Sequence, residues 1–375
     1  VLLVMKIDPA TGNVLWTKYW MGDKTRLQYT DDALGFGIDV SNGLVFITGK
    51  GKSAISTQGM PVIALGTDGS FKWSKIIVPR GNATYAHEAH AIRADGKGNL
   101  YVAGIDKGFG GGAFLAKLKG VDASGTKVAL DWAMNVTGSP VGTNFNSMSL
   151  DAQGDVFLAL DRRGASMFFT VLKVSADGKT ITGKTVPTSK SNTGGSWDNI
   201  FVVRVAGSSV YAGGSIQTSG WDTGKGDGVI AKFATSDLKP AYAALYYTGS
   251  GPNEVCAHST HGIAVNGKDV YLMGQVYSGN LNHYRYWGYW YDYPLAPADY
   301  TAKTSDVAST TLVSPMPNAA LVSATTDPTN FKNDGAYDDI STTLGIEFQD
   351  AKDKNESTHG SQTDGDIFLM KITEK

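Results

Sequence analysis

A short pattern of four strands repeats along this chain, and it constrains the fold more than any other feature. Each unit has an apolar strand, a tight turn, a second strand ending in a small residue, a loop, a third strand that often carries Lys, and a fourth that often carries Trp. A sheet of this kind buries both faces only by stacking on neighbouring sheets, which predicts β-propeller blades with a period of about 55 residues. The first two strands recur as GIDVSNGLVFITG (37–49), AIRADGKGNLYVAG (91–104), SMSLDAQGDVFLAL (147–160), VVRVAGSSVYAGG (202–214) and GIAVNGKDVYLMG (262–274).

Composition supports an all-β class and excludes several partners. The 375 residues include 46 Gly and 10% aromatic residues, a balance typical of short strands joined by tight turns. The net charge of −2 leaves no basic excess for phosphates, which argues against nucleic-acid binding. There is also no polybasic stretch for a membrane surface and no apolar run long enough to predict a transmembrane segment.

We therefore predict a single all-β domain over residues 1–375, a propeller of five to seven four-stranded blades. We name strands by their position in the repeat, from the first to the fourth type. The chain opens with a strand of the third type, Val1–Ile7, followed by one of the fourth type, Asn13–Tyr19. Because it opens inside a strand, we expect that it was trimmed, either by removal of a signal or from a longer precursor. The simplest circular closure makes Asn13–Tyr19 the fourth strand of the last blade and hides that blade's edge. Val1–Ile7 then competes with Asp366–Ile372 for one position, which leaves the number of blades open.

A long insert over residues 280–365 interrupts the last blade, and it begins with a dense run of Tyr and Trp. Aromatic side chains offer large, rigid contact areas with a polar group, as recognition surfaces need. The alternatives are stacking on sugar rings, a subunit or partner interface, and a lid over the propeller's own apolar rim. The predicted binding residues are Tyr284, Tyr286, Trp287, Tyr289, Trp290 and Tyr291.

Histidines recur at two equivalent positions of the repeat, and we expect both positions just before the first strand of a blade, at one mouth of the channel. The nearer position holds Phe36, His90, Asn146, Phe201 and His261. The position three residues earlier holds Ala33, His87, Thr143, Asp198 and His258.

Two chemistries are open for these positions. Imidazoles with a carboxylate are ligands for Zn or Cu, or for Ca where oxygen ligands dominate, and the candidates are His87, His90, His258, His261 and Glu88, with Asp198 as a further oxygen ligand. Alternatively, His87 or His258 acts as a general base beside Asp198, and Cys256 acts as a thiolate nucleophile. The structural interpretation is that these polar side chains cap turns and that Cys256 is buried.

Two pairings of motifs resemble a known class. GIAVNGKDVYLMG (262–274) with DIFLMKI (366–372), and DPATGNVLWTK (8–18) after VLLVMKI (1–7), are similar to the β-propeller repeats of prokaryotic cell-surface proteins and to quinoprotein-type propellers. The resemblance covers nearly the whole chain except about residues 280–365. It implies the propeller fold, and propellers host many activities.

Two classes of function follow. One is an extracytoplasmic binding or structural module, a surface-layer, filament or adhesion component that associates with itself or with a protein partner through its loops and its aromatic insert. The other, implied by the resemblance, is a secreted or periplasmic enzyme with tetrathionate-hydrolase-like or quinoprotein-like chemistry at the channel mouth. A vicinal disulfide of the kind found beside quinone cofactors is missing, since Cys256 is the single cysteine.

Overall fold

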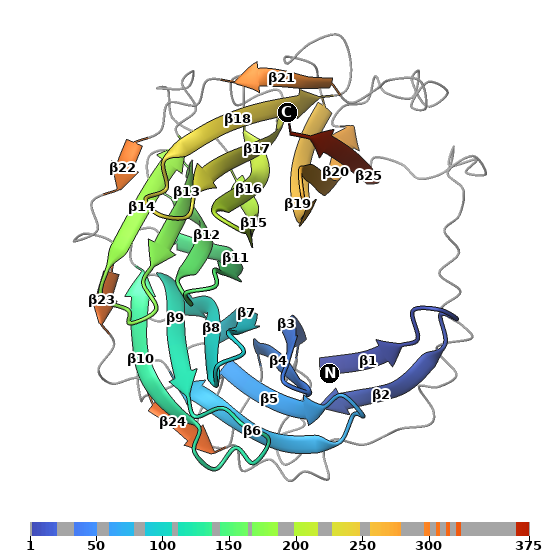
Figure 1. Cartoon of the computed structure of the whole chain (residues 1–375), viewed down its shortest axis with the longest axis vertical. Coiled ribbons are helices and arrows are strands. Elements are labelled where there is room, and N and C mark those ends of the chain that lie inside the picture. Colours follow the sequence, from blue (N-terminus) through green and yellow to red (C-terminus); the bar gives the residue numbers. More distant parts are fainter. Residues whose placement is uncertain are drawn as a thin grey trace. The chain divides into compact units, whose positions relative to one another are not determined.

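The computed structural model (Figure 1) is built of β-strands throughout the part of the chain that it describes. The described residues are 2–20, 34–50, 60–78, 87–106, 112–136, 143–163, 167–186, 199–216, 227–247, 256–278, 296–300, 305–307, 313–315, 320–323 and 365–374. Within these ranges there is no helix that is long and apolar enough to cross a membrane.

The chain divides into two compact units, which are described separately. The first comprises Val1–Gly108, Phe114–Met134 and Pro315–Gly360, and the second comprises Phe109–Ala113, Asn135–Ser314 and Ser361–Lys375.

Four antiparallel sheets each contain four strands that follow one another in the sequence. The first is β3 (Leu34–Ser41), β4 (Leu44–Lys50), β5 (Met60–Gly66) and β6 (Phe71–Val78), and the second is β7 (His87–Ala94), β8 (Asn99–Asp106), β9 (Gly112–Lys119) and β10 (Ala129–Val136). The third is β11 (Thr143–Leu150), β12 (Val156–Arg163), β13 (Met167–Val174) and β14 (Ile181–Val186), and the fourth is β15 (Asn199–Ala206), β16 (Ser209–Ile216), β17 (Asp227–Ala234) and β18 (Pro240–Tyr247). These repeated four-stranded sheets confirm the predicted all-β class and have the strand order of propeller blades.

The remaining long strands form two smaller sheets. The strands β19 (Cys256–Asn266), β20 (Asp269–Ser278) and β25 (Gly365–Thr373) make a three-stranded sheet, and β1 (Leu2–Ile7) pairs with β2 (Val14–Trp20) in a two-stranded sheet. The pairing of β1 with β2 follows the order of strand types in the repeat, and a hairpin closed by a few residues costs little chain entropy. The expected circular closure joins strands of two units that are described separately, so it stays a prediction.

Residues between β20 and β25 contribute four short strands, each of which is the fifth strand of a different sheet. In chain order, β21 (Ala296–Tyr300) pairs with β18, β22 (Ser305–Val307) with β14, β23 (Val313–Pro315) with β10, and β24 (Ala320–Ser323) with β6. In Figure 1 these strands are the short orange arrows, each beside the fourth strand of its sheet. Each fourth strand therefore has a neighbour on its outer side, which protects it against pairing with a foreign strand.

The Lys of the third strand stabilises its own sheet. Its ammonium lies over an aromatic ring of the second strand, a favourable cation–π arrangement, and an acidic side chain lies close to it. These groups are Lys117 over Tyr101 with Asp131, Lys173 over Phe157 with Asp155, Lys232 over Tyr211 with Glu374, and Lys371 over Tyr271 with Asp269. In the first sheet Ala64 takes the place of Lys, and Trp73 on β6 lies 6.2 Å from Phe46 between ring centroids.

The turns explain why Asp recurs between the strands. At each of several hairpins, an Asp side chain accepts a hydrogen bond from the backbone N–H two residues further on, which fixes the turn. The Asp residues are Asp8, Asp68, Asp95, Asp122, Asp151, Asp177 and Asp237. These carboxylates therefore have structural roles in the turns.

Candidate functional site

Every first strand contains a β-bulge, an extra residue that breaks the alternation of its side chains. The extra residues are Phe36 in β3, His90 in β7, Asn146 in β11, Phe201 in β15 and His261 in β19. They are the five equivalent positions that the repeat singled out, but they lie inside the strands and not in front of them. In the sequence, the break in alternation makes each strand seem to begin after the extra residue. In the structure, strand pairing continues on both sides of the bulge, so each strand begins earlier.

The bulge in β7 brings four side chains of β3, β4 and β7 together, which we call the bulge site: Phe36, Lys50, Glu88 and His90. The ring of Phe36 stacks on that of His90, with centroids 4.6 Å apart. The Nε2 atom of His90 lies 3.1 Å from Oε2 of Glu88, and Nζ of Lys50 lies 3.6 Å from Oε1 of the same carboxylate. Glu88 is therefore held between an imidazole and an ammonium group.

A second polar pair lies at the same end of β7 and is completely buried. The Nδ1 atom of His87 lies 3.0 Å from Oδ1 of Asp106, out of line for a hydrogen bond, and Nε2 of His87 has no hydrogen-bond partner among the described residues. An imidazole oriented by a carboxylate is the geometry of a general base, but a base must also reach its substrate. With both side chains inaccessible, the pair favours a structural role.

Gly104 on β8 makes this arrangement possible. It pairs with Ala89 beside the bulge, and a Cβ atom at Gly104 would lie 1.9 Å from the carbonyl oxygen of Glu88. Only glycine allows the two backbones to approach this closely.

In the second unit, the equivalent position repeats the aromatic stack without the carboxylate and lysine. His261 stacks on Phe201 with centroids 4.4 Å apart, and Thr260 donates a hydrogen bond to the carbonyl oxygen of Val229. Cys256 and His258 lie at the start of β19, where their backbones pair with Ser278 and Val276. His261 is exposed, but partial loss of hydration around its imidazole holds its pKa below the usual value of about 6.5.

This stack gives a testable pH dependence. We expect the His261 resonance to titrate below pH 6.5, and Phe201→Ala to raise the midpoint because it restores water to the imidazole. Histidine NMR titrations, with His261→Asn to assign the signal, measure the effect. Val202→Ala on the same strand is the matched control, and an equal midpoint in wild type and Phe201→Ala would contradict the expectation.

The other predicted site residues have mixed outcomes. The structure brings His87, Glu88 and His90 together on β7, and it places His258 and His261 on β19 of the other unit. In the described part of the chain, no group of three or more His, Cys, Asp or Glu side chains is arranged to hold a metal ion. Ala33, Asp198 and the six aromatic residues from Tyr284 to Tyr291 lie outside the described residues, and of Thr143 and Asn146 only the backbone is described.

A second polar cluster surrounds Glu374, and the sequence did not indicate it. The Nζ atom of Lys232 donates to Oε2 of Glu374 at 2.5 Å, and the hydroxyl of Tyr242 donates to Oε1 at 2.7 Å. The hydroxyl of Tyr211 lies 3.2 Å from both oxygens. Burial alone would raise the pKa of Glu374, but these hydrogen bonds outweigh it and hold the pKa below its usual value. The cluster ties the end of β25 to the sheet β15–β18.

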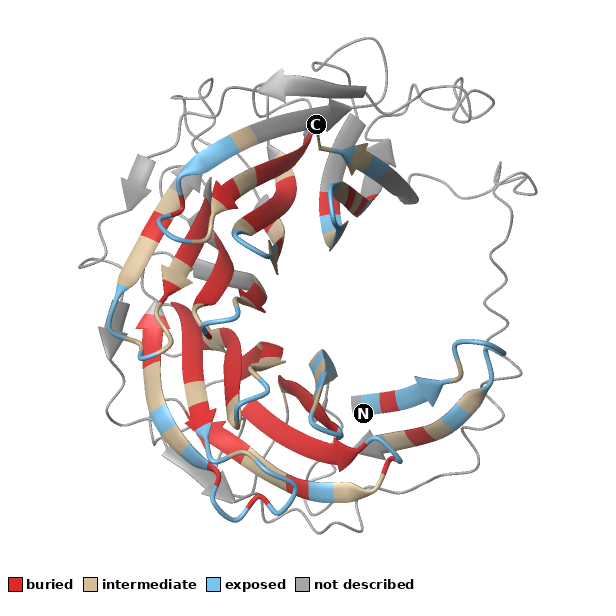
Figure 2. Ribbon diagram, viewed as in Figure 1, coloured by how far each residue is buried: buried red, intermediate tan, exposed pale blue. Residues whose placement is uncertain are grey.

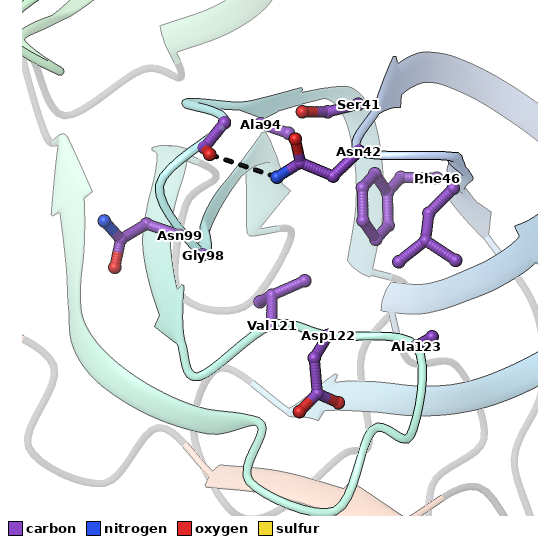
Figure 3. Close-up of a pocket in the computed structure, with 11 residues that line it drawn as sticks. Ser41, Asn42, Phe46, Ala94, Gly98, Asn99, Val121, Asp122 and Ala123 are labelled. Atoms are coloured by element: carbon purple, nitrogen blue, oxygen red, sulfur yellow. Dashed lines mark hydrogen bonds between the residues drawn. The ribbon is translucent and has the colours of Figure 1, made fainter.

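A small cavity lies between the turns of the first two sheets (Figure 3). Its volume is about 220 Å³, and Leu44, Phe46 and Val121 supply its apolar lining. Asn42 donates a hydrogen bond across it to the carbonyl oxygen of Gly96, while Figure 3 shows the Asn99 and Asp122 side chains pointing away from it. With so few polar groups converging on it, the cavity is a packing gap between turns.

Exposed apolar side chains lie on three neighbouring strands of the first unit, on more than one face. Seven of the eight exposed large hydrophobic residues among those described lie on β1, β2 and β3, where Figure 2 shows much of the ribbon in pale blue. We call them the apolar surface: Leu3, Met5, Ile7, Leu15, Phe36, Ile38 and Val40.

The register explains why they are uncovered. Ile38 pairs with Ile47 and Val40 pairs with Val45, so these four side chains lie on one face of the first sheet. Val4 of β1 packs on the part of this face formed by Val45 and Ile47. β1 and β2 are strands of the third and fourth types, and no other strand in the described residues pairs with them. Leu3, Met5 and Ile7 alternate with Val4 and therefore face away from the first sheet.

No protein-family model matches the chain, and no curated protein matches it either. Among solved structures, a Bifidobacterium bifidum protein described as an exo-β-1,3-galactanase is 12% identical, with 78% of this chain and 96% of that one covered and a TM-score of 0.35. A thermostable family-43 glycoside hydrolase is 10% identical (78% and 94% covered, TM-score 0.34), and the tail fibre of a Staphylococcus aureus phage is 7% identical (77% and 77% covered, TM-score 0.24). These scores carry no argument about the function of this chain, and its fold rests on its own strands and registers.

Proposed function

We propose that this chain is an extracytoplasmic binding and structural module, a surface-layer, filament or adhesion component that recognises a protein partner or another copy of itself. Ile38 and Val40, the two residues of the apolar surface that share one face of β3, carry this proposal. Monomeric soluble proteins rarely gather large exposed hydrophobic side chains in one place unless the place is an interface. The resemblance of the repeats to prokaryotic cell-surface propellers supports the same function.

The polar groups support binding over catalysis. In the bulge site, Glu88 is already paired with Lys50 and His90, and His87 behind it is inaccessible. A catalytic carboxylate or imidazole needs an open path to its substrate and a partner that it can exchange. The aromatic run from Tyr284 to Tyr291 is the second recognition element of this proposal.

A charge placed in the apolar surface tests the proposal. We expect Ile38→Glu/Val40→Glu to weaken association about 100-fold, because two carboxylates would be buried without partners. Light scattering measures the mass of the purified chain. A pull-down with the immobilised chain identifies the extracellular proteins that it captures. Ala123→Glu, in an exposed turn of the same unit, is the matched control. Identical masses and identical captured sets for wild type and variant would rule the proposal out.

A further inference from the structure

Asparagine followed by glycine occurs twice in this chain, at Asn42–Gly43 and at Asn266–Gly267. Such a pair is prone to spontaneous deamidation, because a glycine without a Cβ atom lets its backbone nitrogen reach the side chain of the preceding asparagine. Both pairs lie at hairpins, the first between β3 and β4 and the second between β19 and β20. They differ in what holds each asparagine side chain.

The side chain of Asn42 is held in place by the neighbouring sheet. Its Nδ2 atom donates a hydrogen bond to the carbonyl oxygen of Gly96, 3.0 Å away in the turn between β7 and β8. This bond opposes the rotation that would bring Cγ of Asn42 to the backbone nitrogen of Gly43. The first pair is therefore protected by its surroundings.

The side chain of Asn266 has no such restraint. It is exposed, and it takes part in no hydrogen bond within the described residues. Gly267 is also exposed, with a positive φ of 60°, and a Cβ atom placed on it would meet nothing within 4 Å. In the part of the chain that the structure describes, the N–H of Gly267 has no hydrogen-bond partner either. Both reacting groups are therefore accessible.

Aspartate–glycine pairs, which can form the same cyclic imide, show the same contrast. In the pairs Asp68–Gly69, Asp95–Gly96 and Asp177–Gly178, the carboxylate accepts a hydrogen bond from the backbone N–H two residues further on. That bond holds the carboxylate in its turn. Among the pairs whose side chains the structure describes, Asn266–Gly267 is thus the one that no hydrogen bond restrains.

We propose that Asn266 is a modification site, at which the backbone nitrogen of Gly267 attacks Cγ of Asn266. A C–N bond forms, and the side-chain amide leaves as ammonia with the proton of the backbone nitrogen, so that a cyclic imide results. Water then opens either carbonyl group of the imide, which gives aspartate or isoaspartate at this position. Water is the only co-reactant, and no electrons are transferred. The site is independent of the proposed function.

The new carboxylate would act on the end of β25. Asn266 pairs with Asp269 across the hairpin, and the carboxylate of Asp269 accepts a hydrogen bond from the hydroxyl of Thr373 at 2.8 Å. The same carboxylate lies 2.7 Å from the ammonium of Lys371. Like charges directly opposite each other on paired strands are destabilising. Deamidation should therefore weaken the bonds through which Asp269 holds β25.

Isoaspartate would have a second effect, because it adds an atom to the main chain at this turn. The carbonyl oxygen of Lys268 in the turn accepts a hydrogen bond from the N–H of Glu374. Glu374 in turn bonds to Lys232 and Tyr242 of the fourth sheet. A displaced turn would therefore loosen the residue that ties the end of β25 to that sheet.

Peptide mapping, with enzymatic methylation to detect isoaspartate, tests the site. The purified full chain is incubated in mild alkali, once folded and once in urea. In the folded chain we expect Asn42 to react about five to ten times more slowly than Asn266, the factor that a hydrogen bond of ordinary strength supplies. In urea, where that bond is lost, both should react at similar rates.

Two variants assign the signal. Asn266→Gln should abolish the methylation of the folded chain, whereas the matched control Asn42→Gln should retain it. If the folded chain stays unmodified at Asn266, or if Asn42 reacts as fast as Asn266 in the folded chain, the proposal is overturned.

Hydrogen exchange measures the effect on β25. In deamidated chain isolated by ion exchange, the N–H of Glu374 should exchange several-fold faster than in unmodified chain. Asn266→Asp carries the new charge without the extra main-chain atom, so it should show a smaller increase than the isoaspartate form. An unchanged exchange rate at Glu374 in both samples would overturn the link between this site and β25.

Discussion

Replacing Gly104 by Ala is expected to lower the free energy of unfolding by about 3 kcal/mol, the largest effect of any single methyl group in the described residues. The new Cβ would lie 1.9 Å from the carbonyl oxygen of Glu88 and 2.6 Å from Cα of Ala89, both backbone atoms that cannot rotate away. The strands β7 and β8 would have to separate at the bulge. We therefore also expect loss of the stack between His90 and Phe36.

Denaturant unfolding followed by tryptophan fluorescence measures this change. Gly12→Ala is the matched control, because a Cβ there meets nothing within 4 Å and only the positive φ of 75° opposes it. That variant should lose only about 1 kcal/mol. Equal unfolding midpoints for the two variants would show that the close approach at the bulge does not constrain β8.

Removing the carboxylate of Glu374 should have the second largest effect, about 2 kcal/mol of lost stability, since it leaves an ammonium and two hydroxyls poorly paired in a partly buried place. Glu374→Ala loses the bonds to Lys232, Tyr211 and Tyr242, whereas Glu374→Gln keeps part of them and should lose less. Lys179→Ala, which removes an ion pair between exposed side chains, is the control and should change nothing measurable.

The pH dependence of this effect has a definite sign. The pKa of Glu374 lies below its usual value in the folded chain, so its stabilisation is present above about pH 4.3 and is lost as the pH falls through the folded pKa. The pKa values of Lys232 and Tyr242 are raised, so their contributions are lost only as the pH rises through those values. The difference between wild type and Glu374→Ala should therefore be largest near neutral pH and shrink in acid. A difference that grows in acid would contradict the assigned cluster.

The repeat predicted the strands well, because alternation and turn residues are local properties. The segment 262–274 spans the end of β19 and the start of β20, and Asp366–Ile372 lies within β25. The bulges were missed, since an extra residue inside a strand looks the same in sequence as a strand that starts later. The pairing of β1 with β2 follows the order of strand types in the repeat, whereas the closure of the last blade by Asn13–Tyr19 joins two separately described units and stays a prediction.

The candidate site could be predicted only in part. His87, Glu88 and His90 were found because they lie on one strand, and spacing within a strand can be read directly. Lys50 and Asp106 come from neighbouring strands, and their contacts depend on a register that shifts at the bulge. Glu374 was missed for a similar reason, since its partners are more than 130 residues away. The pairing of the insert's short strands with four different fourth strands had no signal in the sequence.

The extra residue in each first strand takes no part in the regular pairing of that strand with the second strand. The pairs on either side keep their hydrogen bonds, while Phe, His or Asn occupies the bulge itself. Related chains can therefore carry different side chains at these five positions without losing the hydrogen bonds between paired strands, much as loop residues vary on a constant fold. Exchange of the five residues between sheets should alter selectivity while the architecture persists.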